Sequence, residues 1–498
     1  MRTPDLLRRL EPQEVITEDE LERGLRTLRY DGVASQLMGT LAGGVFLTAF
    51  ALSLGASPMV IGLLAALAPL SQVAQVPAVP LIEWLGRRKL LVVLGAGASR
   101  LFLLALALLP WLAPPESRIP LLLAGLGIYY LLGTIAGLGF SAWLRDLVPE
   151  DRLGRYMGSR AAIATAVGAA ASLIAGTGVD AARAAGGEQA ALAVLIALGA
   201  AAGLLGVRFL AAAPEPLAPR SSGHWAGRLL QPAADPAYRR LLLFLGAWSA
   251  AVNLAAPFFT VYMLQRLSLP MSWVAGLTVV SQLCNVAFFT AWGRLADRYS
   301  NRAVLAAAGP LFMLSYLLWP LTTAAEQQAL NLALLTAIHL LAGVSTAGVT
   351  LCAGNIALKL APAGESTAYL ATNALVCGAA ATLAALAGGA LATLLAGESL
   401  AISLRWNSAL LGVGGETGVF EVAGLDFLFL AAGLLGLATL TLLRRVPEPG
   451  EHAPREVLSE IRAVARRGLH HVSGVAGLRD LLYFPYPFGH TRRGKRTP

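Results

Sequence analysis

Two ionisable side chains lie deep within long apolar stretches of this 498-residue sequence, namely Arg100 and His339. A charged or titratable group is costly in apolar surroundings, so such residues are candidates for function. Histidine titrates between about pH 5 and 8, and His339 either faces a cavity, where it exchanges a proton, or bonds to a neighbouring helix as a neutral ring. Arg100 either has a structural role, bonded to carbonyls or to Gln72 or Gln75, or binds an anionic group.

Uncharged polar side chains inside the same stretches are candidates for the wall of a cavity. No carboxylate is expected deep in any stretch, because Glu83, Asp297 and Asp426 stand at the edges. Each polar residue alone is equally consistent with hydrogen bonds between helices, but as a set they predict a cavity of moderate polarity. The candidates are Gln36, Tyr129, Tyr130, Asn253, Gln282, Asn285, His339 and Asn373.

Motifs for catalysis and for cofactor or metal binding find no support. Residues 489–495 match the first seven positions of a phosphate-binding loop, but Arg496 replaces the required Ser or Thr and no strand precedes it. The sequence contains no H-E-x-x-H, paired C-x-x-C or G-x-S-x-G. Its cysteines, Cys284, Cys352 and Cys377, all lie in apolar stretches, which argues against a disulfide framework. We therefore expect no enzyme activity, no cofactor and no metal.

The elements that carry these residues are long apolar helices. Apolar residues make up 56% of the chain and charged residues 13%, against about 45–50% and 25% in soluble proteins. Because a membrane span needs roughly 20 apolar residues, we predict an all-α polytopic membrane protein with two six-helix bundles in the lipid bilayer. The predicted spans are 33–54, 58–81, 90–112, 119–143, 160–180, 190–213, 240–265, 271–293, 303–323, 330–352, 367–396 and 425–443.

Basic residues predict the orientation of the chain. The net charge of +9 comes from residues between the spans, which indicates membrane topology and not nucleic-acid binding. One side keeps only Arg118, Arg183, Arg266 and Arg405, so both termini are predicted to be cytoplasmic, in the plasma (inner) membrane. The predicted parts are a cytoplasmic segment (1–30), a first half (31–213), a cytoplasmic linker (214–239), a second half (240–444) and a basic tail (445–498). The tail contains an amphipathic helix that lies on the inner leaflet or in the cytosol.

Two charged loops, each between the second and third span of its half, indicate an internal repeat. The segment 293–302, Gly-Arg-Leu-Ala-Asp-Arg-Tyr-Ser-Asn-Arg, resembles the signature loop of the major facilitator superfamily. Residues 81–89 hold a degenerate copy in which Glu83 corresponds to Asp297 and the acid is again followed by basic residues. The resemblance extends from about residue 30 to 444 and implies the twelve-helix type of this superfamily.

The resemblance also implies roles for particular residues. Helices one, four, seven and ten line the cavity in this superfamily, which places His339 toward the cavity and Arg100 away from it. The loop residues are interpreted as conformational latches, with a topology-setting charge cluster as the alternative. The latch residues are Glu83, Arg87, Arg88, Gly293, Asp297, Arg298 and Arg302.

The function predicted from these features is secondary active or facilitative transport of a small organic solute by alternating access. We expect a monomer whose partners are a small-molecule substrate and the bilayer, and coupling to a proton is left open. The alternative is a transporter-like assembly factor or sensor without transport activity. The missing deep carboxylate and the basic tail leave room for that alternative.

Overall fold

The computed structural model describes residues 11–217, 231–323, 328–362, 365–408 and 413–448. Within these residues, twelve helical segments are long and apolar enough to cross a membrane, which confirms the predicted number of spans. The amphipathic helix predicted in the tail lies outside the described residues.

The second span begins at Pro58 as predicted, and the other five spans of the first half begin earlier in the chain than the sequence indicates. Thr17 and Glu20 form a reciprocal capping box at the start of α2, whose helix runs unbroken from Glu18 to Leu41. The helix therefore begins 15 residues before the predicted start at residue 33. The elements are α2 (Glu18–Leu41), α3 (Gly44–Ser53), α4 (Pro58–Leu70), η1 (Ser71–Ala74), α5 (Gln75–Leu85), α6 (Arg88–Ala107), α7 (Leu109–Leu112), α8 (Pro115–Leu147), α9 (Glu150–Ala184) and α10 (Glu188–Ala212).

The second six spans follow a short helix, α12, which with the start of α13 falls inside the predicted linker 214–239. The elements are α12 (Gln231–Ala234), α13 (Pro236–Ala255), α14 (Phe258–Val261), η2 (Tyr262–Arg266), α15 (Met271–Arg298), α16 (Asn301–Leu317), η3 (Trp319–Thr323), α17 (Gln328–Leu360), α18 (Ser366–Leu394) and α19 (Leu425–Leu443).

The first span of each half is interrupted at a corresponding position. Between α2 and α3 the chain passes Gly43 and Gly44, and Gly44 has a φ of 49°, which favours glycine. Between α13 and α14 the interruption contains Pro257. The number of residues from Gly43 to Pro257 equals the number from Glu83 to Asp297. The two breaks are therefore related by the same internal repeat as the two charged loops.

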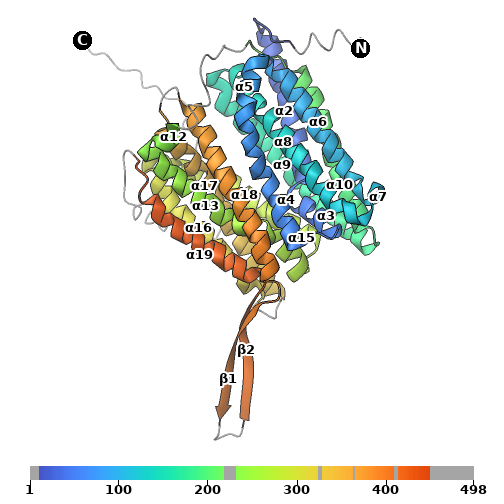
Figure 1. Ribbon diagram of the computed structural model, residues 1–498, viewed down its shortest axis with the longest axis vertical. Helices are drawn as coiled ribbons and strands as arrows, with labels where there is room; N and C mark the ends of the chain where they lie inside the picture. Colours follow the sequence, from blue (N-terminus) through green and yellow to red (C-terminus); the bar gives the residue numbers. More distant parts are fainter. Residues whose placement is uncertain (1–10, 218–230, 324–327, 363–364, 409–412, 449–498) are drawn as a thin grey trace, which may run out of the picture.

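A β-hairpin joins α18 to α19 and projects from the helical bundle (Figure 1). Strands β1 (Ser399–Ser408) and β2 (Val413–Ala423) pair antiparallel, with a bulge between Ile402 and Ser403. The hairpin adds to the predicted helices. The end of the helical bundle that bears the hairpin is called the hairpin end. The opposite end, where α2 begins and α10 and α19 end, is called the linker end.

The two halves meet mainly through two helix pairs, α4 with α18 and α9 with α15. Near the hairpin end α4 and α18 touch through glycines: a Cβ built on Gly62 would lie 2.8 Å from the Cα of Gly389 and 2.6 Å from the Ala385 carbonyl oxygen. Backbones that approach this closely need glycine at the crossing.

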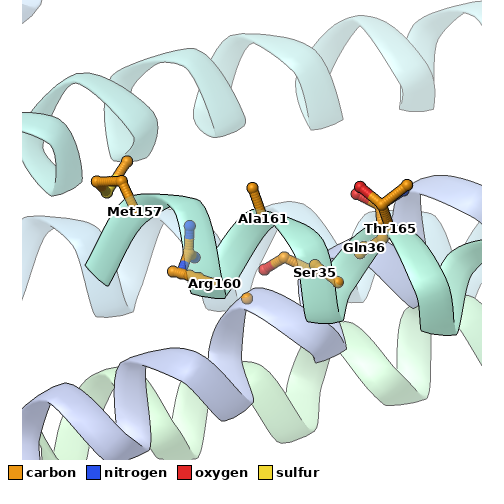
Figure 2. A pocket seen from close by; sticks show the side chains of 8 residues that line it. Ser35, Gln36, Met157, Arg160, Ala161 and Thr165 are labelled. Carbon is orange, nitrogen blue, oxygen red and sulfur yellow. The ribbon is translucent and has the colours of Figure 1, made fainter. Parts of the chain in front are cut away.

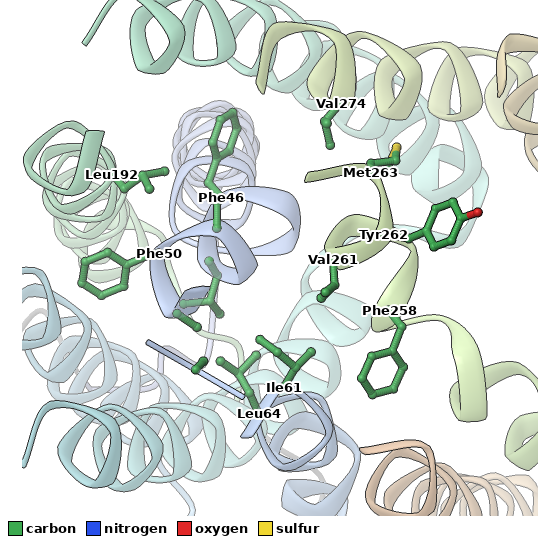
Figure 3. Packing of buried hydrophobic residues seen from close by; sticks show 14 of the residues in the cluster. Phe46, Phe50, Ile61, Leu64, Leu192, Phe258, Val261, Tyr262, Met263 and Val274 are labelled. Atoms are coloured by element: carbon green, nitrogen blue, oxygen red, sulfur yellow. The ribbon is translucent and has the colours of Figure 1, made fainter. Parts of the chain in front are cut away.

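Hydrophobic packing joins the halves at the hairpin end. One cluster there contains Phe46, Phe50 and Leu192 from the first half with Phe258 and Val274 from the second (Figure 3). Toward the linker end, the buried clusters stay within single halves: one holds Leu25, Trp143 and Tyr156, and the other holds Tyr238, Trp292 and Tyr369. The halves are therefore packed together at one end and packed separately at the other.

Candidate functional site

A polar cavity of about 320 Å³ lies between the two halves. The first half contributes Gln36 from α2 and Thr165 from α9, and the second half contributes polar side chains from α15 and α17. Its lining residues are Gln36, Thr165, Ser281, Gln282, Asn285, Val286 and Thr346. The structure thus brings together three of the predicted cavity residues, Gln36, Gln282 and Asn285.

A second cavity of about 330 Å³ shares Gln36 and Thr165 with the first and extends between α2 and α9 (Figure 2). Arg160, which was not among the predicted cavity residues, gives it a positive charge. Its lining residues are Gly32, Ser35, Gln36, Met157, Arg160, Ala161, Ala164 and Thr165. The two cavities adjoin each other, because Gln36 and Thr165 line both of them.

A buried ion-pair cluster adjoins the Arg160 cavity. Asp31 is only 3% exposed, and its Oδ2 lies 3.1 Å from Nη2 of Arg160. Its Oδ1 lies 3.9 Å from Nη2 of Arg100, and the same nitrogen donates to the hydroxyl of Ser35 at 3.3 Å. This cluster links α2, α6 and α9 at one point in the first half.

Two expectations about charged groups are therefore wrong. A carboxylate does lie within a span, because Asp31 belongs to α2 and the sequence-based span began two residues too late to include it. The partner of Arg100 is this carboxylate, together with Ser35, and not Gln72 or Gln75. Those two glutamine side chains bond to each other instead.

The other predicted cavity residues make contacts elsewhere. Nδ2 of Asn253 donates to its own helix at the Ser249 carbonyl, 2.8 Å away. Oδ1 of Asn373 accepts from Sγ of Cys377 at 3.4 Å. The rings of Tyr129 and Tyr130 lie edge to face, 5.0 Å apart, against the shared hydrophobic cluster.

His339 packs against the end of the ninth span. Its Nδ1 lies 2.9 Å from the carbonyl oxygen of Leu335, one turn earlier on α17. Its ring lies edge to face with Trp319 of η3, with the ring centres 5.7 Å apart. The hydrogen bond is to its own helix and not to a neighbouring one, and the two cavities described above do not include His339.

A glutamate caps the third span of each half at the linker end. Oε1 of Glu215 accepts from the backbone N–H of Arg88, at 2.7 Å, where α6 begins. Oε2 of Glu448 accepts from the backbone N–H of Arg302 at 2.7 Å, and Oε1 accepts from that of Asn301 at 3.1 Å, where α16 begins. A carboxylate at a helix N-terminus satisfies orphan N–H groups and complements the helix dipole.

These two glutamates were missed by the sequence analysis, although a signal was present. Each stands in a Pro-Glu-Pro segment directly after the last span of its half, at 214–216 and 447–449. Burial has the largest effect on Glu215 and raises its pKa above the usual value. Burial also acts on Glu448, but hydrogen bonds from Arg302 and Asn301 outweigh it and lower the pKa below 4.5.

The predicted latch residues lie at the linker end, and some have partners other than those expected. Nη1 of Arg88 contacts Oδ2 of Asp146 at 2.6 Å. Nη1 of Arg302 donates to the Val446 carbonyl at 3.1 Å. The guanidinium of Arg298 lies over the ring of Tyr299 at 5.3 Å. Of the remaining latch residues, Arg87 and Asp297 are exposed and Gly293 is half-buried; the side chain of Glu83 lies outside the described part of the chain.

We predict that Glu448→Gln lowers the free energy of unfolding by about 1–2 kcal/mol at neutral pH, because a helix-capping charge is lost. The folded pKa of Glu448 is lowered, so its contribution is present above 4.5 and is lost as pH falls through the folded pKa. Unfolding of both proteins in detergent between acid and neutral pH tests this. Glu365→Gln, at an N-cap without a side-chain hydrogen bond, is the control. If the difference in unfolding free energy between Glu448→Gln and the unsubstituted protein stayed the same in acid, lost packing would be the cause instead.

The sequence profile of the Major Facilitator Superfamily matches residues 32–385, which is most of the chain. The chain belongs to the Major Facilitator Superfamily. Membership confirms the predicted family, the two-bundle fold and the transporter class: the chain is a multi-pass membrane protein and a transmembrane solute transporter. Proteins of this superfamily are generally transporters and not enzymes.

Solved structures of other superfamily members share the fold. A mutant nucleoside transporter superposes with a TM-score of 0.65 at 13% identity, over 86% of this chain and 100% of its own. A D-xylose–proton symporter gives 0.62 at 14% identity, over 86% and 98%. A bacterial homologue of the iron transporter ferroportin, in an inward-facing state, gives 0.58 at 13% identity, over 87% and 99%. No curated protein matches the sequence at a significant level.

Proposed function

We propose that this superfamily member carries a small organic solute by alternating access, with the solute bound in the two adjoining cavities. The observation that carries the proposal is the polar wall that Gln36 and Thr165 from one half form with Gln282 and Asn285 from the other. A site shared by two bundles changes its accessible side when the bundles rock against each other.

The hairpin end is the closed end in this arrangement. Asp180 of α9 reaches across to the second half, where its carboxylate oxygens accept from the backbone N–H groups of Met271 at 2.7 Å and Ser272 at 2.9 Å. Gly176 fits beneath this contact, since a Cβ there would lie 2.9 Å from the Cα of Ser272. These contacts and the shared hydrophobic cluster support a state that opens toward the linker end.

The distribution of basic residues supports placing the linker end in the cytosol, with the protein in the plasma (inner) membrane and both termini cytoplasmic. The structure would then correspond to an inward-open carrier. The charged loops and the paired caps of Glu215 and Glu448 act at this end, and the latch role of Asp297, Arg298 and Arg302 remains part of the proposal.

For a coupling proton we favour Asp31 over His339. Asp31 is next to Gly32, which lines the cavity, and it pairs with Arg160, which also lines it. His339 contacts Trp319 instead. The D-xylose–proton symporter with the same fold shows that proton coupling occurs in this architecture.

A thiol placed in the cavity tests the proposal without knowledge of the substrate. In a variant lacking Cys284, Cys352 and Cys377, we expect Gln282→Cys to react with a membrane-impermeant maleimide from either face of oriented vesicles. Reaction from the linker end should dominate, since that end is open. As a control, Leu94→Cys places a thiol on the outer surface of α6, where Leu94 is exposed. This thiol should face lipid and should not react with the maleimide from either face of the vesicles.

The same experiment addresses the sensor or assembly-factor alternative. A protein of that class has no need to expose the cavity to both sides, so labelling from the linker end alone would contradict alternating access.

A further inference from the structure

The buried polar centre of the first half has more positive than negative charge. Arg100 and Arg160 share a single carboxylate, that of Asp31. Arg100 is 6% exposed, and its Nη1 has no hydrogen-bond partner among the described residues. A buried cation without a full counter-charge is unfavourable, so this centre would be stabilised by one additional negative charge.

Arg160 is the cation that a solute can reach. Its side chain is 20% exposed and forms part of the wall of the 330 Å³ cavity. Nε donates to the Leu28 carbonyl at 3.1 Å and Nη2 to Asp31 at 3.1 Å. An arginine has five N–H donors, and within the described residues Nη1 of Arg160 makes no hydrogen bond. The guanidinium therefore keeps donors for a ligand.

Gly32 leaves room for this guanidinium beside α2. A Cβ at residue 32 would lie 2.7 Å from Nε and 3.0 Å from Cζ of Arg160. Phe140 covers another side of the group, with its ring centre 5.4 Å from Cζ. The helix and the ring hold the planar group while one edge stays at the cavity wall, and a planar fork held in place suits two-point binding of a carboxylate.

The charge balance selects the class of anion. With Arg100, Arg160 and Asp31 all ionised, one negative charge makes the cluster neutral, whereas a dianion such as a phosphate monoester would leave an excess negative charge. The rest of the wall offers the polar groups of Ser35, Gln36 and Thr165 beside apolar surface from Ala161 and Ala164. These features fit a small organic acid with one carboxylate.

We propose that the cavity beside Arg160 binds the carboxylate of a small monocarboxylate solute, and that this carboxylate shares Arg160 with Asp31. Asp31 keeps Arg100 as a partner when the solute engages Arg160. This inference rests on the proposed transport function and specifies its substrate class.

Matched probes test the charge requirement. The purified chain in detergent is titrated with lactate and benzoate and with their primary amides, lactamide and benzamide, and binding is followed by thermal stabilisation. We expect the carboxylates to bind about tenfold or more tightly than the amides. Arg160→Gln should abolish the preference, and Arg160→Lys should retain part of it because the charge remains but the fork is lost.

Two further variants separate a binding role from a folding role. Gly32→Ala moves the guanidinium without removing its charge, so carboxylate binding should weaken while the unliganded protein still folds. Arg152→Gln changes a half-exposed arginine on the same helix and should leave binding unchanged.

The outcomes also distinguish this inference from the transport proposal, because binding in detergent needs no alternation. Any of three results would overturn the monocarboxylate site. The amides could bind as well as the carboxylates, the carboxylates could fail to bind at millimolar concentration, or the preference for carboxylates could survive Arg160→Gln. Two-sided labelling of Gln282→Cys could succeed in any of these cases. Conversely, carboxylate binding with one-sided labelling would refute the carrier and leave the site intact.

Discussion

Asp31→Asn is expected to lower the free energy of unfolding by roughly 3–5 kcal/mol, the cost of leaving buried charges without their partner. Asp31 is the carboxylate between Arg100 and Arg160, and the substitution leaves two guanidinium groups facing each other across an uncharged amide. Denaturant or thermal unfolding in detergent measures the loss. Glu22→Gln, on the exposed face of the same helix, should have little effect.

A second substitution separates charge from packing. If unpaired charge causes the loss, Asp31→Asn combined with Arg100→Gln should recover much of the stability, because the buried cation is removed together with its partner. Single and double variants that are equally unstable would show that the packing of α2 against α9 and α10 is at fault. An Asp31→Asn protein as stable as the Glu22→Gln control would contradict the ion-pair cluster itself.

Gly62→Val is expected to push the two halves apart at the hairpin end. The new side chain would meet backbone atoms, the Ala385 carbonyl oxygen and the Cα of Gly389, and these cannot move aside as a flexible side chain does. Overpacking of this kind typically costs about 1–3 kcal/mol, and it falls only on the state in which this end is closed. The equilibrium should therefore shift toward the state open at the hairpin end.

The thiol of the Gln282→Cys variant reports this shift, with faster labelling from the hairpin end and slower labelling from the linker end. Gly133→Val in α8 is a matched control, because no heavy atom lies within 4 Å of a Cβ built there. Labelling rates that match those of the control would mean that the Gly62 crossing does not hold the end closed.

The spans and the family could be predicted because their signals are local. A run of about 20 apolar residues and the 293–302 loop can be recognised without knowing what they contact. Asp31 was missed because the helix begins well before its apolar run does. The capping box at Thr17 is the signal that marks the true start. The pairing of Arg100 with Asp31, and of Glu215 with the start of α6, depends on contacts between distant segments.

Cavity residues were harder to predict, since a membrane helix is apolar toward lipid and also toward its neighbours. Gln36 and Gln282 do face the cavity, whereas the side chain of Asn253 donates its hydrogen bond to its own helix. Polarity alone does not distinguish these cases. The 399–423 hairpin likewise went unpredicted, because the sequence analysis considered only helical spans.

The interrupted first spans have a consequence for the order of events in transport. A continuous helix transmits a tilt along its whole length, but the breaks at Gly43–Gly44 and at Pro257 give the short segments α3 and α14 their own hinges. Each can swing while the long segments α2 and α13 stay in place. We therefore expect a cycle in two steps: α3 and α14, which pack together in the hydrophobic cluster at the hairpin end, separate first, and the six-helix bundles then move, with an occluded intermediate between the two steps.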